Sequence, residues 1–379
     1  MTSLTSRSPV FVEDDDALDA LLSRLDADGD VPVSLDTEAD SFHHFFEKVC
    51  LVQLETGGDV FLVDPLAPLS LRPLLDRLAP RRLRMHGADY DLRLLHRDHA
   101  FRATALFDTM LAAQLLGEAE IGLQALLARR LGVALDKAHQ RADWSLRPLS
   151  GAMVAYAAAD VAHLPALVDS LEADLQAAGR LSWHAEECAR LVRAPFPEAR
   201  TTDTENGWRL KGTNALTAKE RAYVRALWEA REERARALDL PPFRVLTNER
   251  LLHAARRAAA GEHDLVVLFP GPRPLPGALA TDVRRALDAA RRLPPSEWPP
   301  PRRAEPAEAD PALERAVEAL KGTRNRKAEA LHLDPGVLAG RSVLTAAARA
   351  LLAEPTRDPA RLAERSGISH WRAGLLLSA

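Results

Sequence analysis

Three short apolar runs near the N-terminus constrain this chain more than any other feature. They lie at residues 31–36 (VPVSLD), 49–54 (VCLVQL) and 59–63 (DVFLV), and polar or glycine-containing turns separate them. Runs of this length are typical of β-strands. Because strands joined by such short connections pair in opposite directions, the sequence predicts an antiparallel meander.

Helical patterns follow the meander and alternate with one further strand. Residues 82–88 (RLRMHGA) are predicted to form a strand that ends in a turn, and Gly117 is expected to end one of the helices. Strands followed by alternating strand and helix indicate an α/β domain with a mixed sheet, which we assign to residues 1–200. Its predicted helices lie at 71–79, 89–98, 107–117 and 151–179.

Beyond residue 200 the pattern is helical only. Residues 216–240 form a long amphipathic segment that Pro241 and Pro242 end, and Asn248 is expected to cap the next helix. The Pro-rich stretch 293–311 predicts a semi-rigid linker. We therefore expect two all-α domains, at 208–292 and 312–379. They share a plan of long helix, LDLPP or LDPG loop and further helices, which indicates a diverged repeat.

Charge is divided unevenly along the chain. Residues 1–200 hold 20 Lys and Arg against 31 Asp and Glu, whereas the whole chain holds 50 against 54. An acidic first part and a basic remainder suit carboxylates that bind metal and a surface that binds a polyanion. Such imbalance is also common in proteins where it has no function.

Cysteine usage and the N-terminal sequence bear on the compartment. Cys50 and Cys188 are far apart and give neither a disulfide framework nor, with His43, His44 and His86, a zinc site. The N-terminal region is acidic and lacks an apolar signal core, and no stretch approaches the roughly 18 uncharged apolar residues of a membrane helix. We expect a cytoplasmic protein that uses no zinc and no membrane.

Two carboxylates stand at the end of the first predicted strand. Side chains at positions i and i+2 of a strand point the same way, so Asp36 and Glu38 lie together. Two buried carboxylates repel each other unless a cation or a proton lies between them. Hard oxygen ligands suit Mg²⁺ or Mn²⁺. For this pair taken alone, a strand end that emerges into solvent, with both carboxylates hydrated, is the more ordinary explanation.

Two other segments offer acids that such a site needs. Asp91 lies in the first turns of a helix that follows a strand and a glycine turn, and Tyr156 and Asp160 lie four apart on one face of an alanine-rich helix. Taken singly, each has an ordinary explanation: a helix N-terminal acid, a core aromatic residue and a surface acid. Together they place acids where a strand–turn–helix site gathers them.

The ordered set of motifs resembles a known family. It resembles the DEDD superfamily of 3′–5′ exonucleases, in the subgroup with a tyrosine in the third motif, and more narrowly the ribonuclease D family. The matching segments cover nearly all of residues 30–170 and include DTEADSFHHFFEKVCLVQLET, HGADYDLRLL and YAAADVAHLPAL. The family pattern favours Asp91 over Asp89, which we interpret as a capping or surface acid.

The resemblance implies an RNase H-like catalytic fold and a two-metal mechanism. By motif, Asp36, Glu38, Asp91 and Asp160 hold two Mg²⁺ or Mn²⁺ ions, and Tyr156 orients the attacking water. The implied reaction releases nucleoside 5′-monophosphates from the 3′ end of RNA, with tRNA precursors among the targets. A 3′–5′ DNA exonuclease and a catalytically silent RNA-binding protein are the alternatives.

Substrate contacts are expected in the loop after the first acid pair and in a later polar loop. Rings in such loops can stack on bases, and cations can contact phosphates. Phenylalanines of the first loop would also suit simple packing, and Trp144 suits a packing anchor. The candidates are Ser41, Phe42, His43, His86, Lys137 and Arg147.

The helical part resembles HRDC modules, which bind nucleic acid. The resemblance is carried by ALWEAREERARALDLPPFRVLTNERLLHAA and, more loosely, by ALHLDPGVLAGRSVLTAAARAL. It implies that these modules guide RNA to the catalytic domain, and the KGTRNRK segment (321–327) is the first candidate for phosphate contacts. We expect a monomer.

Overall fold

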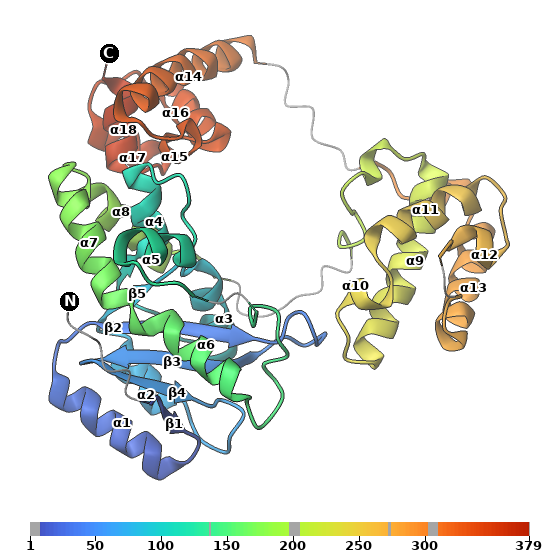
Figure 1. Ribbon diagram of the computed structural model, residues 1–379. Helices are drawn as coiled ribbons and strands as arrows, with labels where there is room; N and C mark the ends of the chain where they lie inside the picture. The colour runs from blue at the N-terminus through green and yellow to red at the C-terminus, as the bar shows by residue number, and fades with distance from the viewer. Residues whose placement is uncertain (1–7, 136–137, 197–204, 272–273, 302–309, 379) are drawn as a thin grey trace. The chain divides into compact units, whose positions relative to one another are not determined.

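The computed structural model (Figure 1) describes residues 8–378 apart from 136–137, 197–204, 272–273 and 302–309. Its contacts divide the chain into two compact units. The first contains residues 1–39, 49–199 and 309–379, and the second contains residues 40–48 and 200–308. The C-terminal helices therefore belong to the same unit as the α/β domain.

A six-stranded mixed sheet forms the centre of the first unit. Its strand order is β1-β4-β3-β2-β5-β6. β2, β3 and β4 pair antiparallel, which confirms the predicted meander, whereas β1 pairs parallel with β4, β5 with β2, and β6 with β5. The strands are β1 (Val10–Val12), β2 (Val33–Ala39), β3 (Val49–Thr56), β4 (Asp59–Val63), β5 (Arg82–Met85) and β6 (Ala105–Asp108).

Helices cover both faces of the sheet. The predicted helix at 107–117 is wrong in its first residues, because β6 extends to Asp108 and the Asp108 carboxylate caps the following helix by accepting from the Met110 and Leu111 amides at 2.8 and 3.2 Å. The helices are α1 (Asp15–Asp28), α2 (Arg72–Leu78), α3 (Asp89–His99), α4 (Thr109–Leu116), α5 (Leu123–Leu131), α6 (Gly151–Ala162), α7 (Leu164–Ala177) and α8 (Leu181–Val192).

Alternation along β2 sorts its side chains between the two faces. Leu35 joins a hydrophobic cluster with residues of α1, α2 and α3, so Asp36 and Glu38 point to the opposite face. There α6 packs against β2, β3 and β4. Pro32 cannot donate a hydrogen bond to a sheet, and β2 begins after it, at Val33. The strand continues to Ala39, so both acids lie within it.

The segment Gly151–Ala177 is long and apolar enough to cross a membrane, judged by length and composition alone. The expectation that no stretch of the sequence approaches the length and apolar character of a membrane helix is therefore wrong. In the structure the segment is two helices, α6 and α7, which meet at His163 because Pro165 in the first turn of α7 cannot continue α6. α6 packs on the sheet and α7 packs on α4 and α5, so the apolar residues serve the core of the first unit.

The second unit is helical in its described part. The predicted cap at Asn248 is wrong: Thr247 caps α11 by accepting from the Arg250 amide at 3.3 Å, and Asn248 accepts from the Arg231 guanidinium at 2.6 Å. The α-helices are α9 (Ala218–Ala237), α10 (Pro242–Val245), α11 (Asn248–Ala259), α12 (Leu265–Leu268) and α13 (Gly277–Arg292), with 3₁₀ turns η1 (Thr213–Ala215) and η2 (Pro295–Glu297).

The C-terminal helices repeat the order of elements at the start of the second unit. In each, a left-handed residue follows a long helix: Asp239 lies just after the C-cap of α9, and His332 is the C-cap of α14. A four-residue helix and a longer helix come next. This shared order agrees with the predicted repeat. The helices are α14 (Pro311–Leu331), α15 (Pro335–Leu338), α16 (Arg341–Ala353), α17 (Pro359–Ser366) and α18 (His370–Leu377).

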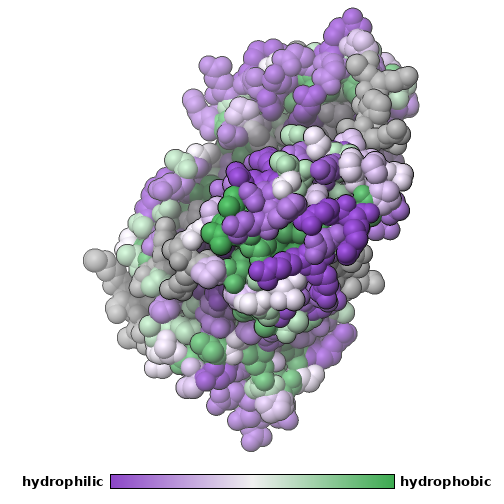
Figure 2. Space-filling view, turned by 90° about the vertical axis from the view of Figure 1, so that its right-hand side faces the viewer, coloured by the Kyte–Doolittle hydropathy of each residue, from purple (hydrophilic) through white to green (hydrophobic). Residues whose placement is uncertain are grey.

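The surface is polar with local apolar areas. Figure 2 shows a face on which hydrophilic residues predominate around a central hydrophobic patch. Within the second unit, Leu238, Phe243 and Val266 are exposed, and a cavity of about 310 Å³ adjoins Val266 and Phe269. The second unit therefore presents apolar as well as charged side chains to solvent.

Candidate active site

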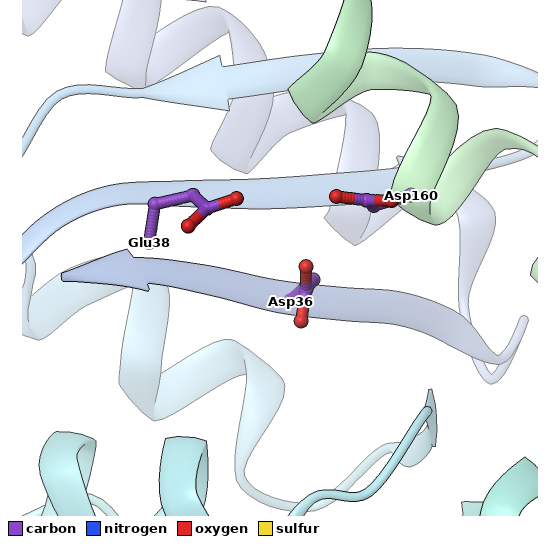
Figure 3. Close-up of side chains that lie close together, drawn as sticks. All are labelled: Asp36, Glu38 and Asp160. Carbon is purple, nitrogen blue, oxygen red and sulfur yellow. The ribbon is translucent and has the colours of Figure 1, made fainter. Parts of the chain in front are cut away.

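Three carboxylates predicted from separate motifs meet between β2 and α6. Ligand oxygens of Asp36, Glu38 and Asp160 all lie within 4.8 Å of one another. Figure 3 shows Asp36 and Glu38 rising from β2 toward Asp160 on α6. The gathering that the sequence predicted for these three acids is therefore present.

Local sequence explains how α6 reaches the sheet. Ser150 caps the helix by accepting from the Met153 amide at 3.2 Å. Ala157, one residue after Tyr156, is fully buried and packs with Leu51 and Leu62 of the sheet. Small side chains let the helix approach closely, and Asp160 is one turn further along the same helix.

Asp91 lies near the three acids but outside their cluster. It is buried at the start of α3, and the Thr37 hydroxyl donates to its Oδ1 at 2.5 Å. The charge of Asp91 nevertheless contributes to the raised pKa of Asp36, which places the two carboxylates in electrostatic contact. Asp91 is thus linked to the site by its hydrogen bond with Thr37, the residue that follows Asp36 on β2.

Asp108 holds the turn that precedes Asp91. Its carboxylate accepts from the Gly87 amide at 3.0 Å and the Ala88 amide at 2.9 Å, in addition to the α4 amides. The sequence does not reveal this role, because a cap on the next helix fully explains an aspartate at this position. The contact joins two turns that are twenty residues apart in sequence.

The site is electrostatically strained without a cation. Burial, followed by the charges of Asp91, Asp160 and Glu38, raises the pKa of Asp36 well above its usual value. Burial raises the pKa of Glu38 to about 9, with added repulsion from Asp160 and Asp91. Burial likewise raises the pKa of Asp160 to about 7 and that of Asp91 to about 6. Carboxylates so arranged favour a cation between them.

Tyr156 donates a hydrogen bond to Asp160 and keeps its proton. Burial and the charges of Asp160, Glu38 and Asp36 raise the pKa of the phenol above its ordinary value. The ring packs 6.0 Å from Trp144, which is 1% exposed. Trp144 is therefore the packing anchor that the sequence suggested.

A cavity of about 600 Å³ opens at the site. Asp36, Tyr156, Asp160 and His86 line it, together with residues 120–125 from the connection between α4 and α5 and the first turn of α5. The His86 ring is oriented by its Nδ1, which lies 2.9 Å from the Thr109 hydroxyl. Burial lowers the pKa of His86, so the neutral ring is favoured.

Arg147 and Lys137 are the two basic candidates for substrate contacts in the later polar loop. The Arg147 guanidinium is bound to the Asp64 carboxylate and to the Cys50 carbonyl, each at 2.7 Å, which fixes the loop before α6. Lys137 lies outside the described residues. A contact of either residue with substrate remains a prediction.

Ser41, Phe42 and His43 belong to the second compact unit, whereas the four acids belong to the first. The Phe42 ring packs edge-on at 6.5 Å from Phe243, and the His43 Nδ1 lies 3.1 Å from the Arg244 guanidinium. Phe42 is 44% exposed. Substrate contacts of these three residues also remain predictions.

The donor set fits a divalent metal. Asp36, Glu38 and Asp160 offer only carboxylate oxygens, the ligands that Mg²⁺ and Mn²⁺ prefer. Their mutual repulsion is the feature that a bound cation removes. Among the neighbouring carboxylates, Asp91 has the largest effect on the pKa of Asp36.

Comparisons with known proteins agree on one kind of enzyme. A 3′–5′ exonuclease domain model matches residues 9–176, and an HRDC domain model matches residues 220–269. A ribonuclease D of Gluconacetobacter diazotrophicus is 34% identical over 298 residues, which covers 77% of this chain and 74% of that protein. A ribonuclease D of Xanthomonas oryzae is 31% identical over 366 residues, 94% of each chain.

Solved structures share the fold. A protein from Bifidobacterium adolescentis superposes with a TM-score of 0.77 at 23% identity, over 98% of this chain and 96% of that one. Escherichia coli RNase D, described as an exoribonuclease involved in structured RNA processing, superposes with a TM-score of 0.67 at 24% identity over 90% of each chain. At these identities the likeness supports the arrangement of elements alone.

Proposed function

The chain belongs to the ribonuclease D family and is a 3′–5′ exonuclease, and on that premise we propose that it hydrolyses RNA stepwise from the 3′ end and releases nucleoside 5′-monophosphates. We propose further that tRNA precursors and other small structured RNAs are its targets, and that it acts as a monomer in the cytoplasm.

One observation carries this proposal. Three carboxylates from β2 and α6 lie within 4.8 Å of one another, beside a tyrosine one helical turn away. They adjoin a cavity of about 600 Å³, which is a suitable size for a terminal nucleotide.

The acids are proposed to hold two divalent cations, Mg²⁺ or Mn²⁺, with Asp36, Glu38 and Asp160 as direct ligands and Asp91 completing the set. When bound, such a cation pair lowers the pKa of a water and stabilises charge on the departing 3′-oxygen. The chain itself fixes the carboxylates on two elements of the core, β2 and α6, so that they need little rearrangement.

Tyr156 is proposed to orient the attacking water. A phenol that retains its proton is a poor base, and burial among carboxylates strengthens that retention. Its hydroxyl is held by Asp160, which lies in the proposed metal shell. Tyr156 thus positions a reacting atom rather than accepting a proton.

His86 is the substrate contact that the geometry favours most among our candidates. It lines the same cavity as Asp36 and Asp160, and its hydrogen bond to Thr109 sets the ring direction. We propose that His86 contacts the 3′-terminal nucleotide.

RNA is proposed to reach the site through contacts with the helical modules. In the 321–327 segment, the Arg324 guanidinium donates to the Ala339 carbonyl at 2.8 Å and Lys321 pairs with Glu318 at 3.0 Å. These cations therefore have structural partners as well. The matched HRDC region, 220–269, is the more direct candidate for phosphate binding.

The test uses 5′-labelled single-stranded RNA and DNA of one sequence, with Mg²⁺, Mn²⁺ or EDTA. Asp36→Asn and Asp91→Asn are compared with Asp89→Asn, an exposed acid on the same helix as Asp91 that pairs with Arg93. We expect an RNA ladder that shortens from the 3′ end, lost with EDTA, Asp36→Asn and Asp91→Asn, and kept in Asp89→Asn.

Other results select the alternatives. A ladder on DNA alone would assign the chain to the DNA exonucleases. Intact RNA and DNA, with salt-sensitive RNA binding by a folded protein, would indicate a binding protein without activity.

A further inference from the structure

Residues 120–125, which follow the end of α4, form one wall of the cavity at the active site. Residues 120–125 line the cavity together with Asp36 and Tyr156, and Gly117 is the left-handed residue that ends α4, with a φ of 76°. The position of the last turn of α4 therefore determines where this wall starts.

The C-terminal helices touch the chain at that point. A Cβ atom on Gly117 would lie 2.5 Å from the His332 carbonyl oxygen and 3.3 Å from a Leu333 methyl group. His332 is itself the left-handed residue that ends α14. Two helix C-termini thus meet without room for a side chain at Gly117.

Arg180 joins the same two helix ends. Its guanidinium donates to the Leu115 carbonyl at 2.8 Å and to the Leu331 carbonyl at 2.9 Å. Carbonyls in the last turn of a helix lack partners within the helix, so one side chain satisfies both termini. The planar guanidinium fork suits two acceptors in fixed directions.

Aromatic stacking extends this contact to α18. The Trp183 and Trp371 rings stack at 4.7 Å with an angle of 10° between their planes. The Trp371 indole donates to the Glu187 carboxylate at 2.9 Å. Trp371 and Leu333 also share one hydrophobic cluster with Leu115 of α4. The C-terminal helices are thereby fixed to the α/β domain by packing as well as by hydrogen bonds.

Ion pairs within the α/β domain also fix the position of this wall. Arg130 on α5 binds the Glu118 carboxylate at 3.0 Å and Asp174 on α7 at 2.7 Å. The connection that follows Gly117 is therefore held by α5 and α7 on one side and by the C-terminal helices on the other.

We propose that the α14–α18 helices position the nucleotide-binding wall of the active site, and that Gly117 and Arg180 are the positioning residues. The inference rests on the proposed function, because the wall is assigned to the 3′-terminal nucleotide. It gives this module a role in substrate affinity that does not require the module to touch RNA.

Gly117→Ala tests the contact, and Gly132→Ala is its matched control. Gly132 ends α5 with a φ of 67°, but a Cβ there meets no atom of the described residues within 4 Å. Both variants therefore carry the same cost of alanine in the left-handed region, and only Gly117→Ala presses on the C-terminal helices.

Each variant is assayed for kcat and KM on a 5′-labelled RNA, for binding of adenosine 5′-monophosphate, and for the rise in Tm caused by Mg²⁺. Because a displaced wall weakens nucleotide binding, Gly117→Ala is expected to raise KM and the Kd of the monophosphate about fivefold or more, with kcat within about twofold. The Mg²⁺-induced rise in Tm stays unchanged, because the acids lie on β2 and α6. Gly132→Ala stays near wild type throughout.

Arg180→Lys gives a second test if Gly117→Ala does not fold. A single ammonium does not reproduce the fork that binds both carbonyls, so the same rise in KM and Kd is expected.

Variants that lower Tm but match Gly132→Ala in KM and Kd would overturn the positioning role and leave the contact as a stabilising one. A wild type that neither shortens RNA nor binds the monophosphate would refute the proposed function instead, and this proposal with it.

Discussion

At the scale of single residues, the site is defined by carboxylates placed where their charges repel. Asp36, Glu38 and Asp160 meet because β2 alternates its side chains and α6 repeats every turn, and both periodicities are visible in the sequence. The hydrogen bond from Thr37 to Asp91 was not predictable, because it depends on how α3 packs beside β2. The hydrogen bonds that Asp108 accepts from the Gly87 and Ala88 amides were not predictable either, because they join segments about twenty residues apart.

The raised pKa values predict how stability depends on pH. Glu38 has an ordinary pKa of 4.5 and about 9 in the folded protein, and Asp160 changes from 3.8 to about 7. The folded protein therefore binds more protons than the unfolded chain between these limits, and its stability falls as pH rises. In EDTA, we expect Tm to decrease steadily from about pH 5 to 9, with a weaker decrease in Glu38→Gln and in Mg²⁺.

Calorimetry at several pH values checks this expectation. A metal-free Tm that rises across that window, or one whose pH dependence is identical in Glu38→Gln, would contradict the electrostatic description of the site.

Tyr156→Phe tests orientation of the attacking water. The ring and its packing on Trp144 remain, and only the hydroxyl is lost. We expect kcat to fall about 10- to 100-fold, with little change in KM.

Because the phenol stays protonated in the wild type, the alkaline side of the pH–rate profile is expected to be the same in the wild type and in Tyr156→Phe. Steady-state kinetics from pH 6 to about 10 provides the check. An alkaline limb present in the wild type and missing in the variant would make Tyr156 an acid–base group.

At the scale of elements, the meander and most helices of the α/β domain were predictable because their apolar patterns are strong. β2, β3, β4 and β5 match the predicted runs closely. β1 has only three residues, and β6 runs directly into α4, so neither strand stands out as a separate apolar run. Residues 107–108 were assigned to the wrong element because helix and strand meet at Asp108 without an intervening loop.

The Asp108 carboxylate links the start of α4 to the turn before α3. Its removal is therefore expected to lower the free energy of unfolding more than the loss of a helix cap alone. Asp108→Ala removes two bonds to α4 amides and two to the turn before α3. We expect a loss of about 2 to 4 kcal/mol in the free energy of unfolding, against about 1 kcal/mol for Asp14→Ala. Asp14 caps only α1, by accepting from the Ala17 amide at 2.8 Å.

Urea denaturation measures both variants, and nuclease assays below the transition show whether Asp91 has moved. Equal losses of stability with full activity in Asp108→Ala would show that the turn before α3 does not depend on this carboxylate.

At the scale of the whole molecule, the sequence indicated an α/β domain followed by helical modules, and that architecture is confirmed. The grouping of α14–α18 with the α/β domain was not predictable. It depends on contacts such as that of Arg180 with Leu331, which lie 151 residues apart and leave no periodic pattern.

The excess of basic residues beyond residue 200 predicts salt-dependent RNA binding. Each phosphate contact releases counterions, so log K for single-stranded RNA falls by about 0.7 per contact for each unit of log salt. We expect the affinity of inactive Asp36→Asn for RNA to fall at least about tenfold between about 50 and 200 mM salt. Fluorescence anisotropy measures it, and an affinity independent of salt would exclude phosphate contacts as the main source of binding.

Metal binding and RNA cleavage measured on the same samples test whether the carboxylates of β2 and α6 form the metal centre. Isothermal titration with Mn²⁺ is carried out on wild type, Asp36→Asn and Asp89→Asn, and the same samples are assayed on labelled RNA. We expect two ions per chain in the wild type and in Asp89→Asn. In Asp36→Asn we expect the loss of at least one ion together with the loss of RNA cleavage. Full Mn²⁺ binding and cleavage by Asp36→Asn would show that the carboxylates of β2 and α6 are not the metal centre of this nuclease.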